Sequence, residues 1–233
     1  MQKSSFWQTI AIPGFMSMLV VACGNQVTQN PQTVNNSQQN TSKTQIDYGD
    51  IIVQEKSDYL MIPVYIKDEG GFFGSSSYKR GASTNNYIFE RKEDGETNIL
   101  LNKKAIIDSF QLLETQKADP KQTNLFLLYN IIDKDTNEDK KLDQNDAVIA
   151  YISDLSGKNL KQLTPNNTKM INSVLLPSQN AVIIKILKDT NNDKKFTSED
   201  TVNFVRVNLN QPEIGKEIIT NKLDQEIKSY MSK

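Results

Sequence analysis

Short apolar, β-branched runs alternate with polar loops through the second half of the chain. Residues 126–132 and 182–187 each precede a polar loop, and residues 148–152 and 202–207 each follow one. Runs of this length with partial alternation are typical of strands rather than helices. Each polar loop is therefore predicted to join two antiparallel strands.

Further apolar runs extend these hairpins into larger units. Residues 109–113 and 171–176 are predicted as preceding strands, and residues 159–163 as a following strand. A more divergent unit opens the domain, with strands predicted at 51–53, 59–66, 87–89 and 98–101. An Asp94-Gly95 turn joins its last two strands, because both residue types tolerate positive φ.

The two polar loops are copies of one another. They align without a gap from the pair Asp135 and Asp189 to the pair Leu155 and Leu209. Between the loop centres, 135–146 and 189–200, seven positions are identical. Such self-similarity is the signature of a repeated structural unit.

Four strands in each of three units suggest the blades of a propeller. Asp154-Leu155-Ser156-Gly157, then Leu160, then Leu163-Thr164-Pro165 resemble the D-x-x-G…L-T signature of TolB-type propeller blades. The expected fold is mainly β, with three blade-like antiparallel units at about 48–104, 105–165 and 166–220. Three blades leave a propeller ring open, so a β-sandwich is the alternative. In residues 221–231, Leu223, Ile227 and Met231 recur every four residues, which predicts a single amphipathic helix that closes the domain.

Residues 1–22 have the pattern of a secretion signal. A short start with one cation, Lys3, precedes an apolar stretch at 6–21 that is too short to span a membrane comfortably. The alternative is a retained transmembrane anchor. Val20-Val21-Ala22-Cys23 resembles the lipobox of bacterial lipoproteins, which implies a diacylglycerol and an N-linked acyl chain, such as palmitate, on Cys23. In Gram-negative lipoproteins an Asp after the lipidated cysteine tends to retain the protein at the inner membrane. The resemblance, with Gly24 at that position, therefore implies the outer membrane, facing the periplasm or the cell exterior.

Residues 23–47 are rich in Gln, Asn, Thr and Ser and contain little that could be buried. Such a segment does not offset the entropy of its own ordering. It is predicted to be a flexible tether between the lipidated cysteine and the β-repeat domain at 48–233.

Both polar loops carry oxygen side chains in the spacing of a calcium loop. They resemble EF-hand and dockerin loops, which implies direct ligands at the first, third, fifth and twelfth positions. These are Asp135, Asn137, Asp139 and Asp146, and Asp189, Asn191, Asp193 and Asp200. By the same resemblance Lys141 and Lys195 contribute backbone carbonyls, and Asp143 and Thr197 act directly or through water.

Two departures from the calcium-loop pattern predict weak binding. The sixth position, normally glycine, is Lys140 and Lys194, and the twelfth is Asp rather than the longer Glu. The strand-like flanks argue against an EF-hand helix pair. The alternative is a pair of solvated hairpin loops that bind no ion.

The composition excludes several kinds of chemistry. The chain has no His, one Cys and a formal net charge of −1. Catalysis through Ser-His-Asp or Cys-His, zinc bound by His and an internal disulfide are therefore excluded. A nucleic-acid partner is not expected, because phosphates require a basic surface.

The expected function is that of a non-enzymatic, lipid-anchored binding or scaffolding module of the cell envelope, with structural calcium and an envelope protein as a possible partner. A Gly- and aromatic-rich loop at 70–80 could reach such a partner, or fold back onto the sheet. The alternative function is an envelope hydrolase that uses two carboxylates in a cleft.

Overall fold

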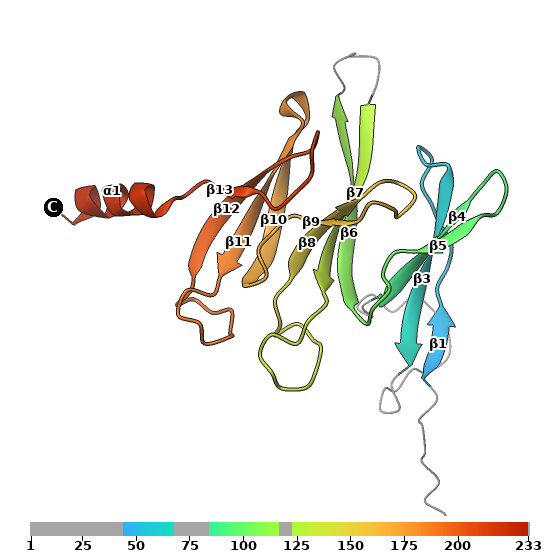
Figure 1. The fold of residues 1–233 in the computed structure, drawn as a ribbon, viewed down its shortest axis with the longest axis horizontal. Helices are drawn as coiled ribbons and strands as arrows, with labels where there is room; N and C mark the ends of the chain where they lie inside the picture. The colour runs from blue at the N-terminus through green and yellow to red at the C-terminus, as the bar shows by residue number, and fades with distance from the viewer. Residues whose placement is uncertain (1–43, 68–83, 117–122, 233) are drawn as a thin grey trace, which may run out of the picture. The chain divides into compact units, whose positions relative to one another are not determined.

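A computed structural model describes residues 44–67, 84–116 and 123–232. The chain divides into two units, Met1–Ser42 and Lys43–Lys233, and the described residues belong to the second. They form three antiparallel sheets followed by one α-helix, shown in Figure 1. The mainly β fold with blade-like antiparallel units is therefore confirmed, and within the described ranges none of the sheets closes into a barrel.

Sheet 1 is formed by the first five strands of the chain. They are β1 (Gln45–Tyr48), β2 (Ile52–Val53), β3 (Tyr59–Lys67), β4 (Asn86–Arg91) and β5 (Thr97–Ile99). The order is β1-β3-β4-β5, and β2 also pairs with β3. The sequence predicted one first strand at 51–53. The structure instead has two short strands on the same edge of β3, separated by Gly49, Asp50 and Ile51.

Sheets 2 and 3 are four-stranded meanders in chain order. Sheet 2 contains β6 (Ile106–Gln116), β7 (Thr123–Ile132), β8 (Ile149–Ser153) and β9 (Lys161–Gln162). Sheet 3 contains β10 (Thr168–Leu176), β11 (Ala181–Lys188), β12 (Thr201–Asn208) and β13 (Lys216–Glu217), with a short 3₁₀ turn, η1 (Pro177–Gln179), between β10 and β11. The polar loops join β7 to β8 and β11 to β12, as the hydrophobic pattern predicted (Figure 1).

Sheet 2 shares one hydrophobic core with each of its neighbours. Tyr129 on β7 packs with Phe89 of sheet 1, whereas Leu128 packs with Ile184 of sheet 3. Successive strand residues point to opposite faces, so β7 supplies both cores by alternation. Buried on both faces, β7 reads as a continuous apolar run rather than an alternating one.

Equivalent strands of sheets 2 and 3 lie opposite one another. The Gln111 Nε2 of β6 donates to the Ser173 Oγ of β10 over 2.7 Å. At the other edge, the Gly215 amide before β13 donates to the Leu163 carbonyl after β9 over 3.0 Å. The strands thus run in the same order across both sheets. We call the face of sheet 2 that carries Leu128 its front and the face that carries Tyr129 its back, and we name the equivalent faces of the other sheets in the same way. The front of sheet 2 meets the back of sheet 3, as in a stack of blades.

The turn after β8 fixes sheet 2 against sheet 1. The Asp154 Oδ1 accepts hydrogen bonds from the amides of Ser156, at 2.9 Å, and Lys158, at 3.1 Å. Gly157 has φ +75°, and a Cβ there would lie 2.3 Å from the Phe89 ring of sheet 1. This blade-like motif therefore provides both a tight turn and a close contact between sheets.

A buried tyrosine contributes a polar contact to the core between sheets 1 and 2. Tyr129 is fully buried, and its hydroxyl lies 3.0 Å from the Ser153 Oγ. Burial raises the pKa of Tyr129, because the phenolate would be desolvated. The side chain therefore stays neutral and hydrogen-bonded in the folded state.

Helix α1 (Asn221–Met231) has the bounds that the sequence pattern predicted. The Thr220 side chain caps it by accepting a hydrogen bond from the Leu223 amide over 3.3 Å. None of its residues is buried, and Leu223, Ile227 and Met231 are 39%, 47% and 82% exposed. The predicted C-terminal helix is therefore confirmed, and its apolar side chains lie exposed.

Candidate calcium-binding loops

The two loops follow the same backbone path. Positive φ occurs at the fourth and sixth positions of each, at Glu138 (62°) and Lys140 (68°) and at Asn192 (59°) and Lys194 (63°). The sixth position is where a calcium loop makes its sharp turn and usually has glycine. The chain makes the same turn with lysine, at a cost of about 1–2 kcal/mol for each residue.

Side-chain oxygens hold this path through matching hydrogen bonds. In the first loop, Asn137 Oδ1 accepts from the Asp139 amide at 2.9 Å, and Asp139 Oδ1 from the Lys141 amide at 2.8 Å. In the second, Asn191 Oδ1 accepts from the Asp193 amide at 3.0 Å, and Asp193 Oδ1 from the Lys195 amide at 2.9 Å. The third and fifth positions thus form successive side-chain-to-backbone turns in both loops.

The first position of each loop has one carboxylate oxygen without a partner. Asp135 Oδ2 accepts from the Lys140 amide at 2.8 Å, and Asp189 Oδ2 from the Lys194 amide at 3.1 Å. The other oxygen of each carboxylate, Oδ1, is buried and has no hydrogen-bond partner. Asp189 as a whole is only 8% exposed. A buried, unpaired carboxylate oxygen is costly, and a cation is one partner that would satisfy it.

The twelfth position of each loop anchors the backbone. Asp146 is fully buried, and its Oδ1 accepts from the Thr136 amide at 2.7 Å while its Oδ2 accepts from the Asp143 amide at 3.0 Å. Asp200 is 9% exposed and accepts from the Thr190 and Thr197 amides at 3.1 and 2.9 Å. These carboxylates draw the two ends of each loop together.

The ninth position differs between the loops. Asp143 Oδ1 accepts from the Asn145 amide at 2.8 Å, whereas Thr197 Oγ1 accepts from the Glu199 amide at 3.2 Å. In the parts of the chain that the structure describes, no three His, Cys, Asp or Glu side chains gather as a metal-ligating cluster. An ion in either loop would therefore rely on the side-chain oxygen of Asn137 or Asn191 and on backbone carbonyls, as well as on carboxylates.

An ion pair between the loops was not predicted from the sequence. Lys194 Nζ lies 2.6 Å from Glu138 Oε1, which links the second loop to the first. The Lys194 hydrogen bond and charge lower the pKa of the Glu138 carboxyl. The two residues belong to different repeats of the chain, and only the stacking of sheets 2 and 3 brings them together.

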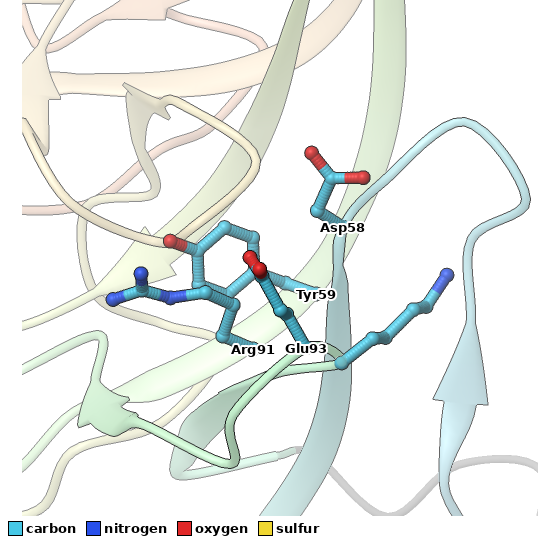
Figure 2. Close-up of a pocket in the computed structure, with 5 residues that line it drawn as sticks. Asp58, Tyr59, Arg91 and Glu93 are labelled. Atoms are coloured by element: carbon cyan, nitrogen blue, oxygen red, sulfur yellow. The ribbon is translucent and has the colours of Figure 1, made fainter.

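A polar hollow outside the loops holds two further carboxylates. It has a volume of about 580 Å³ and is lined by Asp58, Tyr59, Arg91, Lys92 and Glu93, shown in Figure 2. Lys92 Nζ donates to the Gln54 and Ser57 carbonyls, and Arg91 forms ion pairs with Asp94 and Glu96.

Asp58 and Glu93 are both exposed to solvent. Carboxylate pairs that act as acid and base work in sites that exclude water. This hollow therefore gives no specific support to a hydrolase.

Four sequence-based predictions lie wholly or mostly outside the described residues: the secretion signal, the lipidated Cys23, the polar tether at 23–47 and the partner-binding loop at 70–80. The end of the predicted tether is wrong, because residues 45–47 pair with β3 as part of β1. Among the helical segments that the structure describes, none has the length and hydropathy needed to cross a lipid bilayer. Comparison of the chain with protein families, curated proteins and solved structures found no match.

Proposed function

We propose that this chain is an exported, lipid-anchored protein of the cell envelope whose β domain carries structural calcium. The observation that supports calcium best is the buried, unpaired Oδ1 atom of both Asp135 and Asp189. The two residues hold the first position of loops that share one backbone path. The same kind of unsatisfied oxygen at two equivalent places is expected of a repeated ion site.

Calcium in these loops would be held by oxygen atoms, as this hard cation requires. The first site would use Asp135, Asn137, Asp139, the Lys141 carbonyl, Asp143 and Asp146. The second would use Asp189, Asn191, Asp193, the Lys195 carbonyl, Thr197 and Asp200. The ion would neutralise the carboxylates and hold each hairpin closed, and it would stabilise the folded state by mass action.

The affinity is expected to be weak, with a Kd of about 10⁻⁴–10⁻³ M, as in extracellular modules. Lys140 and Lys194 place a cation at the sixth position of each loop. Both oxygens of Asp146 already accept amide protons, so less of their electron density is left for an ion.

Millimolar calcium is expected to raise the thermal midpoint of the protein by several degrees relative to a chelator. At about ten times Kd the stabilisation is about 1.4 kcal/mol per site, which is a shift of roughly 3–6 °C per site for a domain of this size. Asp135→Ala and Asp189→Ala should each lose about half of the calcium-dependent shift. Circular dichroism melts with calcium and with EGTA measure it.

Asp50→Ala is the matched control, because Asp50 is exposed and lies between β1 and β2, outside both loops. It should keep the full calcium response. A midpoint that does not respond to calcium up to about 10 mM, well above the weak-site range, would contradict the calcium proposal.

The proposed site of attachment to the membrane is Cys23, with the chain facing the periplasm or the cell exterior from the outer membrane. Two or more acyl chains give stable anchoring. In this setting the β domain serves as a non-enzymatic binding or scaffolding module, with an envelope protein as its partner.

Cys23→Ser is expected to abolish incorporation of labelled palmitate and to release the protein from the membrane fraction. The measurement is fractionation of cells that express the full chain, followed by autoradiography. Ser37→Ala, within the same polar segment, should leave labelling unchanged. A membrane-bound, unlabelled wild-type protein would contradict lipidation and favour a retained transmembrane anchor.

A further inference from the structure

The two end sheets of the stack each have an apolar face with no covering element among the described residues. On sheet 1, Val53 and Ile99 are 60% and 56% exposed. They pair with Leu60 and Ile88, on the side of the sheet opposite to the buried Met61. On sheet 3, Val174 and Val202 are 58% and 38% exposed. Exposed apolar side chains on the outer face of a sheet are available for contact with another surface.

The two uncovered faces are of opposite kinds: one is the back of a sheet and the other is the front of a sheet. Sheet 2 presents its back to sheet 1 and its front to sheet 3, with equivalent strands opposite each other. The back of sheet 1 and the front of sheet 3 remain uncovered. These are the two kinds of face that meet inside the chain, so the front of one copy is suited to the back of another.

We propose that a second copy of this chain covers both faces, in a head-to-tail pair of six stacked sheets. A head-to-tail contact forms a closed assembly when the rotation returns to the start, and an open filament otherwise. Three sheets are too few for a propeller, whereas six fall within the range of about four to eight blades. Two copies are thus the smallest number that reaches this range.

The charges on the two faces are complementary. Glu90 lies on the outer face of sheet 1, on the third strand of the path, opposite Leu60 near the start of β3. Arg206 lies on the outer face of sheet 3, also on the third strand of its path, opposite Ile183 near the start of β11. Suppose that the contact between copies repeats the internal stacking. The cross-strand pair that contains Glu90 in one copy then lies opposite the cross-strand pair that contains Arg206 in the other. Among the described residues Glu90 forms no ion pair, and Arg206 donates a hydrogen bond to the neutral Gln179 side chain over 2.6 Å.

The mass of the full chain in mild detergent tests the proposal, measured by sedimentation equilibrium with the detergent density-matched. The wild type is expected at twice the mass of the mature, lipidated chain. Ile99→Arg and Val174→Arg should each give monomers, because every contact of a head-to-tail pair uses both faces. Tyr230→Arg, at an exposed apolar position of α1 (66% exposed), is the control and should remain dimeric. Circular dichroism checks that each variant is folded.

Charge exchange tests the pairing of the faces. Glu90→Arg should weaken the dimer at least tenfold, and adding Arg206→Glu to the same chain should restore it. A wild type that stays monomeric at 100 μM overturns the proposal, since the faces are then covered by the same chain or by another partner. A dimer broken only by Ile99→Arg, only by Val174→Arg or only by Tyr230→Arg overturns the head-to-tail arrangement. A series of growing oligomers overturns closure.

Discussion

Replacing Gly157 with alanine is expected to lower the free energy of unfolding by about 2–5 kcal/mol. Two costs add at this position. A non-glycine residue at φ +75° costs about 1–2 kcal/mol. The new Cβ would also lie 2.3 Å from the Phe89 ring, and overpacking of this kind typically costs about 1–3 kcal/mol. Urea unfolding followed by circular dichroism measures the loss.

Gly95→Ala is the matched control for this prediction. Gly95 has nearly the same φ, +76°, but a Cβ there would have no neighbour within 4 Å. It should cost only the backbone term of about 1–2 kcal/mol. Equal losses in the two variants would contradict the claim that this turn holds sheet 2 against the Phe89 ring of sheet 1.

Asp146→Ala is expected to cost about 2–4 kcal/mol even in the absence of calcium. The fully buried carboxylate accepts hydrogen bonds from the Thr136 and Asp143 amides. Its removal leaves these amides without their partner, and a buried unsatisfied donor costs about 1–3 kcal/mol. The measurement is the urea midpoint in EGTA, which separates the role of Asp146 as an anchor from any role as a ligand.

The control is Asp143→Ala in the same loop. Its carboxylate is half-buried and accepts only from the Asn145 amide among the described contacts. It should cost less than about 1 kcal/mol in EGTA. If Asp146→Ala were as mild as Asp143→Ala, the twelfth position would not be the anchor of the loop.

The hairpins were predictable because their strands are short, apolar and β-branched and because the loop between them is repeated. Strand β1, at the first edge of sheet 1, could not be predicted in this way. Gln45, Ile46, Asp47 and Tyr48 continue a polar segment and leave every residue of β1 exposed, so no buried stripe marks the strand. The strand forms because it pairs with β3, and that pairing lies beyond any local pattern.

The end of the chain shows the same limit. The spacing of Leu223, Ile227 and Met231 and the Thr220 cap define a helix locally. Amphipathic spacing gives a helix an apolar stripe, but it does not say which surface covers that stripe. The exposure of this stripe therefore could not be predicted from the local pattern.

The candidate ligands were predictable from spacing alone, because a calcium loop is a local structure. Two features of the site could not be predicted from the spacing. The spacing does not reveal that both oxygens of Asp146 turn towards backbone amides. Nor does it reveal that Glu138 meets Lys194, since that contact requires two sheets to stack.

The number of calcium ions bound per chain tests the central claim most directly. Isothermal titration of the calcium-free protein measures it, with the Asp135→Ala and Asp189→Ala variants alongside. The account predicts two ions for the wild type and one for each variant, with Kd values of about 10⁻⁴–10⁻³ M. No saturable binding up to about 10 mM, or equal stoichiometry in all three proteins, would contradict it.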